Sequence, residues 1–150
     1  MDLDDRTRDV LRLVGVQLAV VSAAVHVWWG FPRLLVYAQA GTFPDPRPVL
    51  FLVSAAAILA GVVALVAGVR ERPLYAAGIA VLSAYSLGYV AWHLGDHGGF
   101  LPGLTGATHT EPVLPVLVAH LADPADAVSM AAQLGAIVCF ALLLAADGNR

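Results

Sequence analysis

Histidine is the residue type in this chain with the most scope for chemistry, and it occurs at five positions: His26, His93, His97, His109 and His120. His93 and His97 are four residues apart, and Asp96 follows His93 by three. On a helix this spacing places two imidazoles and a carboxylate on one side, where they can bind one divalent cation. The sequence therefore predicts a zinc or copper site of His93, Asp96 and His97, completed by His120 or His26.

A second arrangement of histidines would hold haem. His26 and His93 lie at similar depth on two different predicted helices, as the axial ligands of a b-type haem do in membrane bundles. Glycines would leave room for the ring, at positions Gly15, Gly30, Gly78, Gly88 and Gly95. The simplest alternative needs no cofactor, because His26 can hydrogen-bond across a helix interface to a serine or tyrosine of the third span. The cofactor is therefore left open between haem b, a divalent metal and none, and none is the first expectation.

The elements that must position these histidines are apolar helices. The 150 residues are 59% hydrophobic and 13% charged, which excludes an ordinary soluble globule. Crossing the hydrocarbon core takes about 20 apolar residues, and four stretches of that kind are predicted, at about 13–31, 49–69, 73–95 and 125–146. Nothing alternates with period two as a barrel strand would, so the spans are helices. We expect an all-α, integral membrane four-helix bundle that forms a single transmembrane domain over residues 1–150.

The arginines predict how the bundle is oriented. Positively charged residues favour the cytoplasmic side of a membrane, and six of the eight basic residues fall on one side of the predicted spans. Both termini are then cytoplasmic, and the loop 96–124, with a short interfacial helix over 112–121, lies outside. A composition without lysine but rich in arginine and aspartate is typical of a prokaryote. The expected location is the prokaryotic plasma membrane, crossed several times.

Proline and small residues predict where spans end and which faces pack. Pro32 and Arg33 are expected to end the first span, and Asp123 is expected to cap the fourth. The first span carries a stripe of small residues with one histidine: Gly15, Ala19, Ser22, His26 and Gly30. The second span carries a similar seam: Ser54, Ala57, Gly61, Ala64 and Gly68. The third presents a polar and aromatic face: Tyr85, Tyr89 and Trp92.

Several functions are excluded by missing residue types. Without lysine the chain has neither Schiff-base chemistry nor a Walker phosphate site. Its single cysteine, Cys139, cannot form a disulfide within the chain. A net charge of -3 argues against a nucleic-acid partner.

The function that fits these patterns best is a non-catalytic accessory or assembling unit in the membrane, with a histidine cluster on its outer face. The alternative is a metal- or haem-binding redox enzyme, or a subunit of one, that uses the same histidines. If the outer segment forms a cap, it brings His109, Glu111 and His120 near His26 and His93 and encloses a pocket. The expected partners are the lipid bilayer and a second copy of the chain or another membrane protein.

Overall fold

The computed structural model describes residues 3–94 and 113–147, and in this part of the chain every regular element is an α-helix. The helices are α1 (Asp5–Ala40), α2 (Arg47–Val66), α3 (Glu71–Leu94), α4 (Val113–His120) and α5 (Pro124–Asp147). All but α4 are long and apolar enough to cross a membrane, which fits a multi-pass membrane protein by length and composition. The predicted all-α fold with four spans is confirmed, and α4 lies where a short helix was expected.

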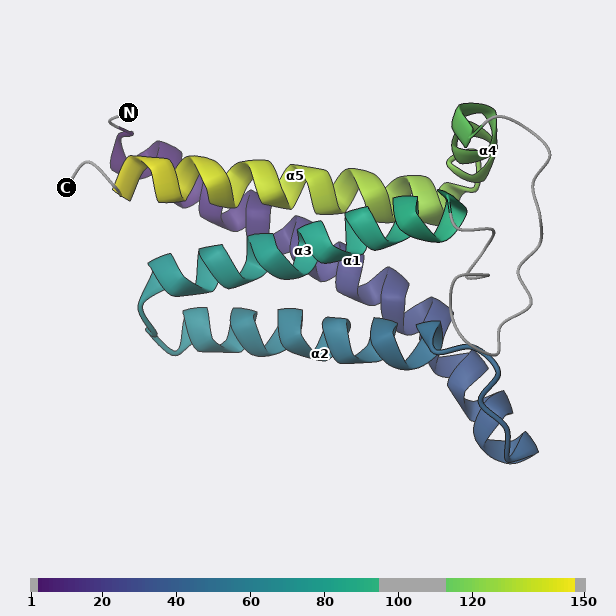
Figure 1. Cartoon of the computed structure of the whole chain (residues 1–150). Coiled ribbons are helices and arrows are strands. Elements are labelled where there is room, and N and C mark those ends of the chain that lie inside the picture. Colours follow the sequence, from purple (N-terminus) through teal and green to yellow (C-terminus); the bar gives the residue numbers. More distant parts are fainter. Residues whose placement is uncertain (1–2, 95–112, 148–150) are drawn as a thin grey trace.

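The four long helices run alternately up and down the bundle (Figure 1). The start of α1 and the end of α5 lie together at one end, and α4 lies at the other. α5 packs against both α1 and α3, and α1 also packs against α2, whereas α2 makes far less contact with α3. The seam between α2 and α3 is therefore the loosest in the bundle.

The small-residue stripe predicted for α1 is buried in full, from Gly15 to Gly30. A Cβ atom at Gly15 would lie 2.8 Å from Cε1 of Phe140, and one at Gly78 of α3 would lie 3.1 Å from its Cε2. The Phe140 ring thus fits between two glycines and stacks on Tyr75, with ring centroids 5.5 Å apart. Gly15 and Gly78 make room for this phenylalanine, which corrects the expectation that they accommodate a haem ring.

The first helix does not end at Pro32, so that prediction was wrong. α1 continues through the proline to Ala40 and stops at Gly41, whose φ of 65° is left-handed backbone that suits glycine. A proline inside a helix removes one backbone hydrogen bond and distorts its neighbours. The hydrogen bond that Pro32 cannot donate leaves the Trp28 carbonyl without its usual helical partner. One residue further on, the Arg33 side chain donates from Nη1 to the Trp29 carbonyl at 2.9 Å.

Side chains cap two of the helices. The N–H of Thr7 donates to Asp4 Oδ1 at the start of α1 and holds the pKa of that carboxyl below its usual range. The N–H of Ala125 donates to Asp123 Oδ1 at 2.8 Å, so the predicted cap of the fourth span is confirmed. The chain thus enters both α1 and α5 at an aspartate, which satisfies backbone donors that the first turn of a helix leaves unpaired.

The seam predicted for the second span is only partly right. α2 buries Ser54, Ala55 and Ile58, whereas Ala57 is exposed. A Cβ atom at Gly61 would meet nothing within 4 Å. The small residues permit close approach of a neighbour, but α2 and α3 make few contacts, and no described neighbour packs against Gly61.

Candidate functional site

A cavity of about 570 Å³ lies in the bundle at the end away from the termini. It is bounded by the last turns of α3, the first turns of α2 and α5, the middle of α1, and His120 of α4. Its volume is within the range of about 300–1,000 Å³ that is typical of small-molecule sites. Five aromatic side chains supply much of its wall: Trp29, Phe51, Tyr85, Tyr89 and Trp92.

Gln133 of α5 links the polar side chains buried beside the cavity. Its amide nitrogen lies 3.3 Å from Ser22 Oγ, 3.2 Å from His26 Nε2 and 3.1 Å from Ser129 Oγ. Its amide oxygen accepts a hydrogen bond from Ser86 Oγ at 2.9 Å. The glutamine, only 4% exposed, therefore ties α1, α3 and α5 together.

The same hydrogen bonds fix the protonation of His26. Ser54 Oγ donates to the Phe51 carbonyl at 2.8 Å, so it accepts a hydrogen bond from His26 Nδ1 at 3.3 Å. His26 Nε2 then accepts from the Gln133 amide. His26 is therefore held as a neutral imidazole with its proton on Nδ1, packed against Phe51 and Tyr85 with ring centroids 4.9 Å and 4.7 Å away.

This arrangement bears on the haem hypothesis. Both ring nitrogens of His26 already have protein partners, from α2 and from α5. A haem iron would have to displace the Gln133 amide from Nε2. The cofactor-free alternative predicted a hydrogen-bond partner on the third span, whereas the partners come from α2 and α5, and the third span contributes a ring contact from Tyr85.

His93 and His120 come together in the lining of the cavity. Their ring centroids lie 4.4 Å apart in an edge-to-face arrangement. Nδ1 of His93 lies 2.8 Å from the Tyr89 carbonyl, and Nδ1 of His120 lies 2.9 Å from the Val116 carbonyl, so each Nδ1 carries a proton. Asp126 of α5 is close enough to interact electrostatically with both rings.

The structure brings together part of the predicted metal site. Asp96 and His97, together with His109 and Glu111, lie outside the described residues. Within the described part of the chain, no three histidine, cysteine or acidic side chains are arranged to hold a metal ion. The metal site of four ligands therefore stays a prediction, of which the structure describes the pair His93 and His120.

Two buried hydrogen-bond donors beside the cavity lack a partner in the described structure: the Tyr89 hydroxyl and the Trp92 indole N–H. The Asp126 carboxylate lies near the Tyr89 hydroxyl and interacts with it electrostatically, although the described structure contains no hydrogen bond of normal geometry from either donor. Both residues line the cavity and lie one turn apart on α3. Buried polar groups nearly always have a partner, so two unpaired donors in one wall require an explanation.

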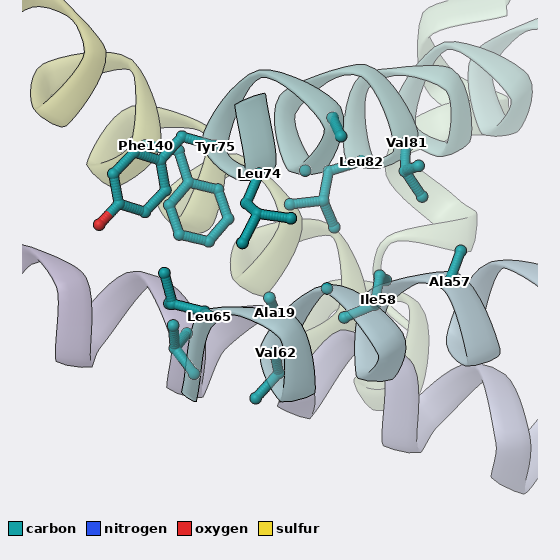
Figure 2. Close-up of a pocket in the computed structure, with 14 residues that line it drawn as sticks. Ala19, Ala57, Ile58, Val62, Leu65, Leu74, Tyr75, Val81, Leu82 and Phe140 are labelled. Atoms are coloured by element: carbon teal, nitrogen blue, oxygen red, sulfur yellow. The ribbon is translucent and has the colours of Figure 1, made fainter. Parts of the chain in front are cut away.

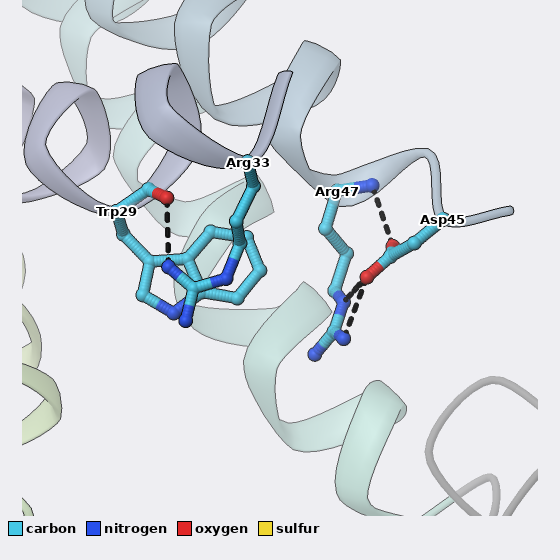
Figure 3. Close-up of polar contacts among 4 residues, drawn as sticks. All are labelled: Trp29, Arg33, Asp45 and Arg47. Carbon is cyan, nitrogen blue, oxygen red and sulfur yellow. Dashed lines mark hydrogen bonds and ion pairs between the residues drawn. The ribbon is translucent and has the colours of Figure 1, made fainter. Parts of the chain in front are cut away.

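Arginines pack on two tryptophans that line the cavity, Trp29 and Trp92, and Figure 3 shows Arg33 beside Trp29 and Arg47 beside Asp45. The Arg33 guanidinium lies over the Trp29 ring, 3.8 Å from its centroid. Arg47 lies 4.0 Å from the Trp92 ring centroid and is held by Asp45 through an ion pair of 2.7 Å. Because cation–π contacts and the ion pair fix Arg47, the Trp92 side chain is held in place at the cavity.

Gln133 and Arg47 both line the site, and sequence analysis did not assign either of them to it. Asp126, Ser129 and Gln133 recur every three or four residues on an otherwise apolar helix, and all three line the cavity. That polar stripe on α5 matches the one on α3, and the two together could have located the site. Arg47, within a proline-rich turn, gave no comparable signal.

No known protein family, curated protein or solved structure matches this chain.

Proposed function

We propose that the protein is a non-catalytic accessory unit of the plasma membrane that binds one small amphipathic molecule in this cavity. The observation that carries the proposal is the pair of buried donors, Tyr89 and Trp92, which make no hydrogen bond to the residues that the structure describes. Leaving a buried donor unpaired costs about 1–3 kcal/mol. A bound molecule with acceptor oxygens at this wall would satisfy both groups.

The aromatic wall supports a molecule with a flat apolar body. Aromatic side chains bury large areas and prefer stacked or edge-on contacts with other rings. Trp29 and Phe51 already make such a contact, with centroids 4.9 Å apart, and Phe51 lies 5.7 Å from Tyr85. These rings form a preformed surface, so binding of a ligand would lose little conformational entropy in ordering the side chains.

A hydrolytic role for the buried serine and histidine is disfavoured. Ser54 and His26 are the residue types of a nucleophile and its base, and their side chains are in contact. A serine nucleophile needs a base that takes its proton. Here Ser54 donates to the Phe51 carbonyl and His26 Nδ1 carries a proton, so the serine is not activated. These contacts support a structural role for the pair and a binding role for the cavity.

The surface of the bundle supports a location within the bilayer. Large apolar side chains are exposed on each of the long helices, including Trp28 on α1, Val63 on α2, Leu87 on α3 and Val138 on α5. Lipid tails would cover such surfaces, as would another membrane protein. With both termini cytoplasmic, as the arginines predict, the cavity would open near the outer surface.

Native mass spectrometry tests the proposal. Protein released from membranes in mild detergent should carry a bound molecule in wild type and lose it in the double variant Tyr89→Phe, Trp92→Phe. The matched control is Tyr37→Phe, Trp28→Phe, which changes the same residue types outside the described cavity lining and should retain the molecule. Equal retention in wild type and both double variants, or no bound molecule in any of them, would overturn the proposal.

A further inference from the structure

A second, apolar groove of about 150 Å³ lies in the seam between α2 and α3 (Figure 2). Ile58, Val62 and Leu65 of α2 lie on one side, and Leu74, Val81 and Leu82 of α3 lie on the other. The described residues that line it carry no charge. Its one side-chain hydroxyl, on Tyr75, donates to Glu71 and accepts from Arg12, so it is already satisfied.

The groove and the aromatic cavity follow one another along the same seam. On α3, Val81 lines the groove and Ala84 lines the cavity, which is a separation of about 4.5 Å along the helix axis. On α2, Phe51 lines the cavity and Ala57 lines the groove, with less than two turns between them. From Tyr89 to Leu74 the seam is about 22 Å long at 1.5 Å per residue.

The seam is open toward the bilayer. Leu50, Ala84 and Ala91 line the cavity and are nevertheless exposed. Gly88 lines the cavity and Gly61 lines the groove, and a Cβ atom added at either position would meet nothing within 4 Å. A molecule dissolved in the bilayer could therefore enter sideways between α2 and α3.

The charges of the cavity argue for a neutral head group. Arg47 is the guanidinium of the described lining, and it is already paired with Asp45. Asp126 adds a carboxyl group to the same lining. Within the described lining, a fatty acid or a phospholipid phosphate would meet no guanidinium other than this paired one. The unpartnered Tyr89 hydroxyl and Trp92 indole N–H instead suit neutral carbonyl oxygens.

We infer that the molecule is a quinone, with its flat dicarbonyl ring in the aromatic cavity and its hydrocarbon tail along the α2–α3 groove. This inference rests on the proposed function and names the class of ligand for the same site. The ring stacks among Trp29, Phe51 and Tyr85, and Tyr89 and Trp92 donate to its carbonyl oxygens. The tail lies against Gly61 and its neighbours, where the helices leave space.

Two quinones and two glycine variants test this placement. The probes are 2-methyl-1,4-naphthoquinone, which has no tail, and the same ring carrying an isoprenoid tail. Each is titrated into detergent-solubilised protein, and binding is measured by the quenching of tryptophan fluorescence. A Cβ atom at Gly61 meets nothing within 4 Å, so Gly61→Leu places its side chain in the groove and should weaken binding of the tailed quinone about tenfold, because the side chain and the tail would compete for the same space. It should leave the tailless ring unaffected. Gly88→Leu fills the mouth of the cavity and should weaken both.

The control is Val63→Leu on the same helix, at a side chain that is 67% exposed, and it should bind both quinones as wild type does. Equal effects of Gly61→Leu on the two quinones would overturn the placement of the tail. If neither quinone binds saturably but the molecule retained on purification still depends on Tyr89 and Trp92, the quinone inference fails and the proposed function stands. If nothing binds in a way that depends on Tyr89 and Trp92, both fail.

Discussion

The side-chain amide nitrogen of Gln133 lies 3.2 Å from Nε2 of His26, across the interface of the first and last helices. The contact joins residues 107 positions apart in the chain. It places a neutral histidine and a buried glutamine at the floor of the aromatic cavity, where each satisfies the other. The hydrogen bonds around Gln133 therefore couple the stability of the bundle to the shape of the site.

Replacing Gln133 by leucine should destabilise the protein. The change leaves His26 Nε2, Ser22 and Ser129 without the amide that they share, at a cost of about 1–2 kcal/mol. Gln17→Leu, at an exposed position on α1, is the matched control and should leave stability unchanged. Thermal unfolding in detergent measures both, and equal melting temperatures for the two variants would refute the role given to Gln133.

Two glycine-to-alanine changes should have opposite effects. A methyl group at Gly15 would lie 2.8 Å from Phe140 and 2.9 Å from Cβ of Cys139, so Gly15→Ala should cost about 1–3 kcal/mol. At Gly61 nothing lies within 4 Å, and alanine favours the helix by about 1 kcal/mol over glycine. Unfolding in a denaturing detergent should rank Gly61→Ala above wild type and Gly15→Ala below it. The reverse order would show that the helices do not meet as described.

Arg33→Lys should not behave as a conservative change. The guanidinium both lies flat over Trp29 and donates to its carbonyl, and an ammonium group cannot reproduce that geometry. We expect a loss of about 0.5–1 kcal/mol and a shift in Trp29 emission, measured after Trp28 and Trp92 have been replaced by phenylalanine. Arg72→Lys, at an exposed arginine of α3, is the control and should change neither quantity.

Cysteine labelling tests the predicted orientation. In a Cys139→Ala background, Arg70→Cys between α2 and α3 should be protected from a membrane-impermeant maleimide in intact cells and labelled after lysis. Thr42→Cys, in the loop at the opposite end, should be labelled in intact cells. The opposite pattern would place the cavity on the cytoplasmic side.

Sequence patterns predicted the number of spans, the short fourth helix and the buried stripe of α1, because composition and helical periodicity determine these features locally. The course of the chain past Pro32 was not predictable in this way, because proline commonly ends or kinks a helix, whereas α1 continues through it to Ala40. The role of Gln133 depends on the packing of α5 against both α1 and α3. The sequence pattern of a single helix does not determine which helices become its neighbours. The seam on α2 failed for a related reason. Small residues show where a neighbouring helix can approach closely, but α3 packs against only part of the small-residue face of α2.

The most direct test of the central claim is the indole N–H resonance of Trp92 in the nuclear magnetic resonance spectrum of nitrogen-15-labelled protein. Protein purified from membranes in mild detergent should keep its bound molecule, and the acceptor of that molecule should shift this resonance downfield. After the molecule has been removed by detergent exchange, the resonance should move upfield. The Trp28 resonance, from an exposed side chain, should stay in place. A Trp92 resonance at the same position before and after stripping would contradict the claim that its buried N–H binds a ligand.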